Sequence, residues 1–537
     1  MLPIPTPRAI ALFLGCIGMW TVGLVTRSWA ATALGSGAVI LLAAVLAATI
    51  PLGRRVRAQR LEFAWWLAQR DGLSGAVVPQ VPFQIRCYVR HRGTTPIELT
   101  RVEPILAPSA RVLDLSPAHI HVSPRARNEF AFSIIAAAAG RVVLHGLAVN
   151  LRGPLGLFDV PLYFPNALAV KVLPRSVALR STVRPAMTGQ PIDRPGRHRM
   201  RRRGGGTDLH ELRELQPGDP FKSIAWKASA KAGQLLVREV DQEVQQTLLL
   251  VADVAGSMRG GRLGERKLDF ALELCVAQAR AWLDRGDRVG LITVDGRVLG
   301  HVPPGEGPAQ LIRLYDALLA TTEVVDSDLT ALDDRAVIEL VARYVRHQDG
   351  LDFGHGRGGW DVSSLVQHVK GALPAARSGE APQAATQAGV ELRRFCRERG
   401  LSLAHRATPA GGDKAEGLSA ALRLAGGHTR VPQTIVLITD LDGLVDYDGL
   451  RAAARLLSRR GHSLSLLVPD AQALAQPDIH ADAEPELRVI YGRAEQRRLR
   501  EATQRFLKLG VGVQVVKPGQ PTRTAEPKRF TRATRSA

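Results

Sequence analysis

Two long stretches without a charged residue open the chain. Residues 10–25 and 29–52 carry no charge, and only Thr26, Arg27 and Ser28 separate them. As helices they would span about 24 and 36 Å, comparable with a bilayer hydrocarbon core of about 30 Å. The pattern predicts a transmembrane helical hairpin within residues 1–60. The alternative is a cleaved signal peptide ending near Ala30, in which case the second stretch still anchors the chain.

The charges that flank these stretches predict an orientation. Arg54, Arg55, Arg57 and Arg60 follow the second stretch, whereas the turn between the stretches holds only Arg27. Positive residues are retained on the cytoplasmic side of a membrane. We therefore expect a multi-pass protein of the inner (cytoplasmic) membrane, with its soluble domains in the cytoplasm.

Residues 75–180 have the pattern of a small β-sandwich-like domain. Short apolar segments at 81–89, 128–135 and 141–149 alternate in part, and frequent prolines oppose long helices. A second segment, 197–243, starts with six Arg or His among the seven residues 197–203. We interpret that start as a solvated linker, and the basic tail 521–537 as disordered.

Residues 244–520 alternate between apolar strand patterns and amphipathic helix patterns. Strands are predicted at 247–253, 287–294, 433–440, 463–468 and 511–516, and helices at 268–283, 309–319, 450–458 and 495–507. This alternation predicts an α/β domain with a doubly wound, largely parallel sheet. Residues 324–410 interrupt it with a predicted helix at 331–347, and we interpret them as an insertion.

Composition narrows the classes of function. The 537 residues carry a formal net charge of +21, which suggests an anionic partner. Aromatic residues make up only 5%, which leaves few side chains for base stacking and makes nucleic acid an unlikely partner. The four cysteines never form C-x-x-C, so a disulfide scaffold and a zinc ribbon are excluded. No Gly-Lys dipeptide occurs, so the chain has no Walker A loop of its own.

Two acidic residues follow buried strand patterns. Asp253 and Asp440 each end an apolar run, and ligands of open α/β sheets bind beyond the carboxyl ends of the strands. Two carboxylates near a hydroxyl suit a hard divalent cation. A metal-dependent hydrolase is one alternative, but no general base or nucleophile accompanies the pair, and Ser257 is not in a G-x-S-x-G elbow.

The segment Asp253-Val-Ala-Gly-Ser257 resembles the D-x-S-x-S signature of von Willebrand factor type A domains. Asp253 and Ser257 match, and Ala255 replaces the first serine. The threonine loop of that family aligns best with residues 415–422, where Glu416 takes the place of threonine. Asp440 matches the acid of the third loop. The resemblance implies a degenerate metal site formed by Asp253, Ser257, Glu416 and Asp440, with weak binding of Mg²⁺ or Ca²⁺ at most.

A longer motif precedes this segment. Residues 212–231 resemble the signature R-x-Y-x-x-G-D-x-x-R-x-I-D-W-x-x-S-A-R of the family catalogued as domain of unknown function 58, although Leu215 and Ala225 depart from it. The signature residues here are Arg213, Gly218, Asp219, Trp226, Lys227 and Ser229. Residues 153–158 also resemble the family's P-L-G-L-F element. From the residues alone, we interpret Trp226 as a packing anchor and the segment as a structural clamp between the β-domain and the α/β sheet.

These resemblances imply a function of interaction, not catalysis. They imply a membrane-anchored cytoplasmic adaptor with a degenerate type A-like domain that works with a MoxR-type AAA+ ATPase in protein remodelling or complex assembly. The client protein is not implied. The alternative is a protein whose basic segments bind an anionic membrane surface or nucleic acid, which would give binding a steep salt dependence.

Overall fold

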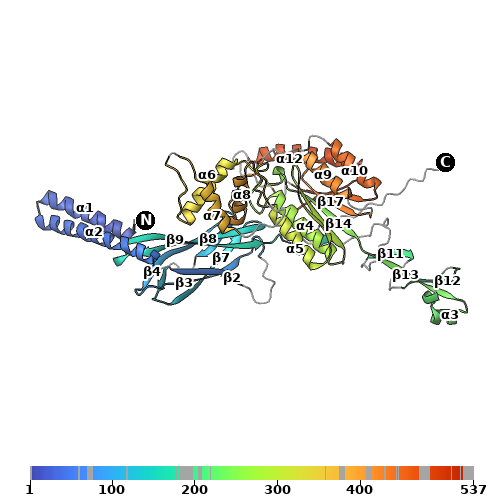
Figure 1. The fold of residues 1–537 in the computed structure, drawn as a ribbon, viewed down its shortest axis with the longest axis horizontal. Coiled ribbons are helices and arrows are strands. Elements are labelled where there is room, and N and C mark those ends of the chain that lie inside the picture. The colour runs from blue at the N-terminus through green and yellow to red at the C-terminus, as the bar shows by residue number, and fades with distance from the viewer. Residues whose placement is uncertain are drawn as a thin grey trace. The chain divides into compact units, whose positions relative to one another are not determined.

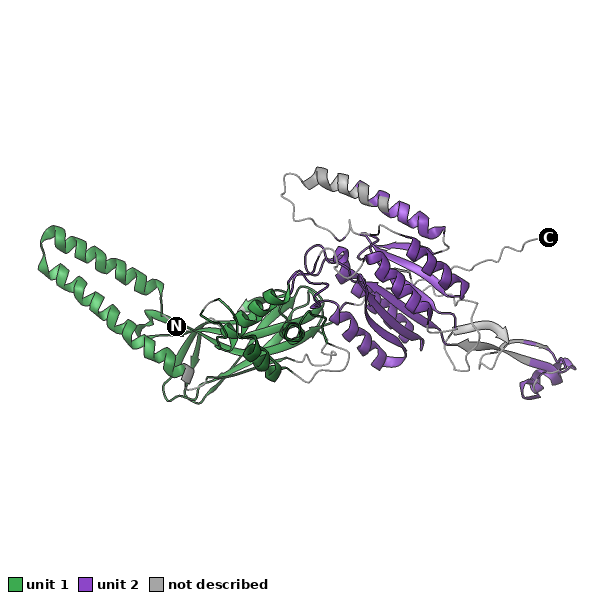
Figure 2. Cartoon of the chain, turned by 45° about the horizontal axis from the view of Figure 1, so that its top comes forward, with its two compact units in different colours: residues 1–173, 333–402 green, residues 174–332, 403–537 purple. Residues whose placement is uncertain are grey.

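A computed structural model describes most of the chain. The described residues are 3–58, 61–68, 77–115, 119–175, 179–180, 198–203, 209–217, 219, 221–356, 358–373, 381–406, 413–427, 431–442, 444, 447–470, 474, 484–508, 511–519 and 522–523. They form two compact units (Figure 2). Unit 1 contains residues 1–173 and 333–402, and unit 2 contains residues 174–332 and 403–537. The predicted disordered tail, 521–537, lies outside the described residues except for residues 522–523.

The two apolar stretches are helices, as predicted. α1 (Pro7–Thr26) and α2 (Trp29–Ala58) are long and apolar enough to cross a membrane, with mean hydropathies of 2.0 and 2.3 over their most apolar windows. They pack closely where their small residues meet, since a Cβ on Gly23 would lie 2.6 Å from Thr32 Cγ2. Most of their large apolar side chains are exposed, among them Leu14, Leu24 and Ile40. Such a surface is stable in lipid and unfavourable in water.

The base of the hairpin is fixed to the β-domain of unit 1. β1 (Ile4–Pro5) pairs with β9 (Phe158–Val172), and the Thr6 hydroxyl donates to the carbonyl of Gly156 over 2.9 Å. A Cβ on Gly153 would lie 2.7 Å from Thr49 of α2, so this position needs glycine. The segment 153–158, which resembles the P-L-G-L-F element, therefore contacts both the start of α1 and Thr49 of α2.

The β-domain contains two antiparallel sheets around one apolar core. The first has the order β1-β9-β8-β4-β6, and its other strands are β8 (Gly140–Arg152), β4 (Ile97–Leu106) and β6 (His119–Val122). The second has the order β2-β3-β7-β5, with β2 (Glu62–Leu67), β3 (Phe83–Arg90), β7 (Arg127–Ala136) and β5 (Ala110–Leu115). Both sheets contribute to the core, for example Leu147 and Leu151 from β8 and Ile85 and Phe132 from β3 and β7.

Most of the predicted insertion clusters with this β-domain in unit 1 (Figure 2). Its helices are α6 (Asp334–Gln348), α7 (Val362–Ala372) and α8 (Gln387–Arg399). Arg141 of β8 forms a 2.6 Å ion pair with Glu398, and His145 Nδ1 lies 3.0 Å from the Tyr344 hydroxyl. These contacts join the helices to β8.

The segment before the α/β sheet forms a three-stranded arm. β13 (Leu236–Val244) pairs antiparallel with both β11 (His198–Arg203) and β12 (Leu209–Glu214). The connection from β12 to β13 contains the short helix α3 (Trp226–Ala232), at the end of the arm (Figure 1). A two-residue pairing of β10 (Leu179–Arg180) with β20 (Thr522–Arg523) lies elsewhere in unit 2.

Unit 2 also contains a six-stranded sheet of order β16-β15-β14-β17-β18-β19. Its strands are β14 (Thr247–Asp253), β15 (Arg288–Val294), β16 (Val298–Gly305), β17 (Thr434–Ile438), β18 (Ser463–Pro469) and β19 (Gly512–Val516). β16 is an antiparallel edge strand, and the other pairings are parallel. The predicted α/β content is therefore present.

Helices cover both faces of this sheet (Figure 1). α4 (Lys267–Leu283) and α5 (Gly307–Ala320) pack on the face that carries Leu248 and Leu250. α9 (Lys414–Gly427), α10 (Asp448–Arg459) and α12 (Glu484–Leu507) pack on the face that carries Leu249 and Val251. The uninterrupted apolar run of β14 is thus explained by burial on both sides.

Candidate functional site

The two predicted acids meet at the carboxyl edge of the six-stranded sheet. Ala252 of β14 is in register with Ile438 of β17, so Asp253 and the Thr439–Asp440 segment leave adjacent strands at the same edge. Asp253 Oδ1 accepts from the Ala255 amide over 3.0 Å, and its Oδ2 accepts from the Thr439 hydroxyl over 2.6 Å. These bonds fix the carboxylate, which is 1% exposed.

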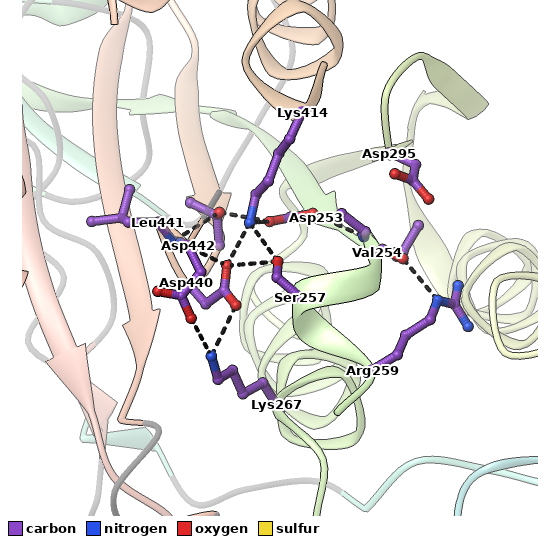
Figure 3. Close-up of polar contacts among 12 residues, drawn as sticks. Asp253, Val254, Ser257, Arg259, Lys267, Asp295, Lys414, Asp440, Leu441 and Asp442 are labelled. Atoms are coloured by element: carbon purple, nitrogen blue, oxygen red, sulfur yellow. Dashed lines mark hydrogen bonds and ion pairs between the residues drawn. The ribbon is translucent and has the colours of Figure 1, made fainter. Parts of the chain in front are cut away.

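Lys414 lies between the two carboxylates (Figure 3). Its ammonium is 2.7 Å from Asp253 Oδ2, donates to Ser257 Oγ over 2.9 Å, and forms a close ion pair with Asp440 Oδ1. Ser257 Oγ in turn donates to Asp440 Oδ1 over 3.1 Å. The Lys414 side chain is only 6% exposed, so these three oxygen ligands replace its lost hydration.

A second lysine completes the cluster from the opposite side of Asp440. Lys267, the first residue of α4, is 3.0 Å from Asp440 Oδ2 and 2.6 Å from Asp442 Oδ2. The Asp442 amide donates to Asp440 Oδ1 over 3.1 Å. Three carboxylates and two ammonium groups therefore form one continuous ion cluster, and its outer member, Asp442, is the most accessible to solvent.

Lys414 and Asp440 favour their charged forms, whereas burial, together with the neighbouring charge of Asp440, raises the pKa of Asp253 above its ordinary value. Burial alone would lower the pKa of Lys414, but Asp253 and Asp440 outweigh burial and raise it above its ordinary value. Burial would raise the pKa of Asp440, but Lys414 and Lys267 together hold it below its ordinary value. Since Asp440 contacts two ammonium groups and Asp253 only one, Asp440 is the more readily ionised of the two acids.

The structure places Glu416 away from the other predicted ligands. Glu416 is exposed in the first turn of α9, whereas Lys414, two residues earlier, points into the cluster. Residues two apart on a helix are separated by roughly 200° around its axis, so they cannot face the same site. Our alignment of the threonine loop placed a ligand at Glu416 because we expected an oxygen ligand in that loop. The overlooked signal was a lysine at the start of an apolar helix.

Among the signature residues whose side chains the structure describes, the contacts observed lie within the arm and none involves this cluster. Arg213 lies on β12, in register with Val237 of β13, and Gly218 lies outside the described residues. The Asp219 carboxylate accepts from the Gln216 amide over 2.8 Å, which stabilises the turn. Ser229 is buried, and its hydroxyl accepts from the Leu236 amide over 2.9 Å and so joins α3 to β13. This part of the signature stabilises the end of the arm.

Trp226 and Lys227 differ from these structural positions because both are exposed. We predicted a packing anchor at Trp226, but its side chain is 54% exposed and makes an edge contact with Phe221, with ring centroids 5.2 Å apart. The buried side of the short helix α3 is occupied by Ser229 instead.

Comparisons with known proteins support the resemblance to the family catalogued as domain of unknown function 58. A family model described as "Protein of unknown function DUF58" matches residues 211–346, which include most of the signature and β14. A search of curated proteins found no match.

Solved structures resemble the chain only distantly. A FixG-related protein from Vibrio parahaemolyticus is 9% identical, with 21% of this chain and 95% of that chain covered and a TM-score of 0.15. A native alpha-2-macroglobulin fragment from Escherichia coli is 10% identical, with 75% and 60% covered and a TM-score of 0.18. These scores are too low to establish a shared fold.

Proposed function

We propose that the chain is a membrane-anchored cytoplasmic adaptor that binds its partner through the carboxyl edge of the six-stranded sheet. The proposal rests on one observation, the rigid arrangement of the side chains at this edge. A buried ion cluster joins the β14–α4 loop, the start of α9 and the segment after β17. These parts of the chain also carry the exposed Leu263, between Ser257 and Lys267 in sequence, the exposed Glu416 and the half-buried Asp442. Rigidly held, partly apolar edges of this kind suit protein recognition.

The strand order further supports a type A-like domain. Numbered from β14 within the sheet, the order is 3-2-1-4-5-6, with an antiparallel strand at one edge. The DUF58 match over residues 211–346 covers β14 and the loop that carries Ser257. Together they favour a degenerate von Willebrand factor type A-like fold and, through the family resemblance, a MoxR-type AAA+ ATPase as the partner.

The geometry of Ser257 favours binding over catalysis. A serine 2.9 Å from a lysine resembles a Ser–Lys dyad, in which a neutral amine removes the serine proton. Here two carboxylates raise the pKa of Lys414, so the ammonium has no free lone pair. Ser257 also already donates to Asp440. We therefore propose no enzymatic role for this site.

Co-purification from solubilised membranes tests the adaptor proposal. We expect the tagged full chain to recover an AAA+ ATPase, in amounts that differ with and without nucleotide, because the chain has no Walker A loop of its own. Leu263→Asp combined with Glu416→Lys should reduce recovery about tenfold, as expected for the loss of a central contact. Both residues are exposed, so the variant should keep the native circular dichroism spectrum.

The matched control is Ile312→Asp on α5, where the side chain is also exposed. This variant should recover the ATPase as the native chain does. Recovery of the ATPase by the Leu263→Asp/Glu416→Lys variant at the native level would contradict the assigned edge. Failure to recover any ATPase with the native chain would contradict the adaptor role.

A second candidate function rests on the end of the arm. Phe221 and Trp226 are 73% and 54% exposed and contact each other edge to face. Lys222, Lys227 and Lys231 are exposed beside them. Aromatic rings beside lysines suit the interface of an anionic membrane, where the rings enter the headgroup layer and the ammonium groups pair with lipid phosphates.

Co-flotation with vesicles tests this second candidate. The full chain, held in zwitterionic nanodiscs, should float with anionic vesicles and be released by high salt. Phe221→Ser combined with Trp226→Ser should abolish co-flotation, whereas Ile312→Ser should not. Equal flotation of both variants would contradict a membrane role for the arm, and competition by RNA at the same residues would indicate nucleic acid instead.

A further inference from the structure

The type A resemblance implies a divalent cation at the carboxyl edge of the six-stranded sheet. The oxygens expected to bind the cation include carboxylate oxygens of Asp253 and Asp440 and the hydroxyl of Ser257. The Lys414 ammonium already contacts one oxygen of each residue. A metal bound by the same three oxygens would lie where Nζ lies, so the two cannot coexist.

We propose that Lys414 is a built-in cation that replaces the divalent metal of this site, so that the carboxyl edge is fixed without any metal ion. The chain itself supplies the positive charge that Asp253 and Asp440 require.

The charges of the cluster support this assignment. The ionised cluster contains the carboxylates of Asp253, Asp440 and Asp442 and the ammonium groups of Lys414 and Lys267. Its net charge is therefore −1. An added Mg²⁺ would place two more positive charges beside a fixed ammonium at a distance where repulsion is strong. Without Lys414, two buried carboxylates and a hydroxyl would face each other, and such an oxygen set favours a hard divalent cation.

Glu416, the predicted fourth ligand, does not provide an alternative oxygen for a metal. Glu416 is exposed and lies on the other side of the first turn of α9. Within the described part of the chain, no group of three or more His, Cys, Asp or Glu side chains that could hold a metal is present. The remaining donor set therefore fits an ammonium and does not fit a metal.

A built-in cation changes how a partner would be recognised, a consequence that rests on the proposed adaptor function. In a metal-dependent adhesion site the metal bridges the domain to its ligand. The Lys414 side chain is too deeply buried to do so, at 6% exposed. A partner would instead contact the surrounding residues Leu263, Glu416 and Asp442, and chelation of divalent ions would leave nucleotide-independent binding unchanged.

Thermal unfolding of the purified full chain with Mn²⁺ tests the built-in cation without any partner. Mn²⁺ should not shift the melting temperature of the native chain. Lys414→Ala should melt at a lower temperature, and Mn²⁺ at 100 times its dissociation constant should raise that temperature by about 5 °C or more. The double variant Lys414→Ala/Asp253→Asn should lose this stabilisation by metal.

A control variant and a second measurement complete the test. Lys370→Ala removes an exposed lysine of α7 and should gain no response to Mn²⁺. Manganese electron paramagnetic resonance should show one bound ion in Lys414→Ala and none in the native chain. The proposal is overturned if the native chain binds Mn²⁺ through Asp253 and Asp440. It is also overturned if Lys414→Ala shows neither a bound ion nor stabilisation by metal. Neither result depends on whether an ATPase binds.

Discussion

Asp440→Asn should lower the free energy of unfolding of the six-stranded sheet by about 3–5 kcal/mol, the range for removal of one member of a buried ion pair. The change leaves Lys414, which is 6% exposed, with only one carboxylate, and it separates Lys267 from its more buried partner. Asparagine keeps the size of the side chain, so the loss reflects charge and not packing. Asp442→Asn is the matched control and should cost less than about 1 kcal/mol, because Asp442 is partly exposed.

The effect of Asp440→Asn should depend on pH. The two ammonium groups hold the folded pKa of Asp440 below its ordinary value, despite burial. Its stabilising contribution is therefore present above the unfolded pKa of about 3.9 and is lost as the pH falls through the lower folded pKa. Urea unfolding at pH 7 and below pH 3 measures both limits. An Asp440→Asn protein as stable as the native chain at pH 7 would show that the ion cluster contributes nothing to stability.

A reporter that functions only in the cytoplasm should be active when it is fused after residue 537. The hairpin α1–α2 returns the chain to the side from which it entered, and Arg54, Arg55 and Arg57 favour the cytoplasm for the residues after α2. Alkaline phosphatase, which requires the periplasm, should be inactive at the C-terminus and active when inserted in the turn after Arg27.

Charge exchange supplies the matched variant for this topology experiment. Replacing Arg54, Arg55 and Arg57, at the C-terminal end of α2, by glutamine, and adding two arginines next to Arg27, should weaken the preference or reverse it. Replacing Arg451, Arg455 and Arg459 of α10, which are exposed, by glutamine should leave the topology unchanged. High phosphatase activity at the C-terminus of the native chain would contradict the cytoplasmic location and, with it, the proposed partner.

The parts of the fold with an uninterrupted pattern could be predicted closely from the sequence. The strand predicted at 247–253 coincides with β14, and the helix predicted at 268–283 differs from α4 by one residue. Both are buried on at least one complete face, so burial and pattern agree. β16 was missed because it is an antiparallel edge strand that contains Pro303 and Pro304. The helices α7 and α8 were missed because their segment was interpreted as a loop-rich insertion.

The remaining errors concern contacts between distant residues. Ser257 and Lys414 are separated by 157 positions, and the place of Lys414 at the start of an apolar helix does not identify the partners of its side chain. Arg141 and Glu398 are separated by 257 positions, so the packing of the insertion on β8 has no local signal either. The proximity of Asp253 and Asp440 could be predicted because both follow buried strands. The carboxyl ends of parallel strands lie at one edge of a sheet, so backbone topology alone places these residues near each other.

Site-specific photo-crosslinking in intact membranes tests the central claim, that the carboxyl edge of the six-stranded sheet binds an AAA+ ATPase at the membrane. A photoreactive side chain is introduced at residue 263, in the loop between Ser257 and Lys267 of the ion cluster, or at residue 312 on α5, both of which are exposed positions. We predict a crosslink to an AAA+ ATPase from residue 263, undiminished by chelation in the absence of nucleotide, and none from residue 312. No ATPase adduct from residue 263, or equal adducts from both positions, would contradict the account.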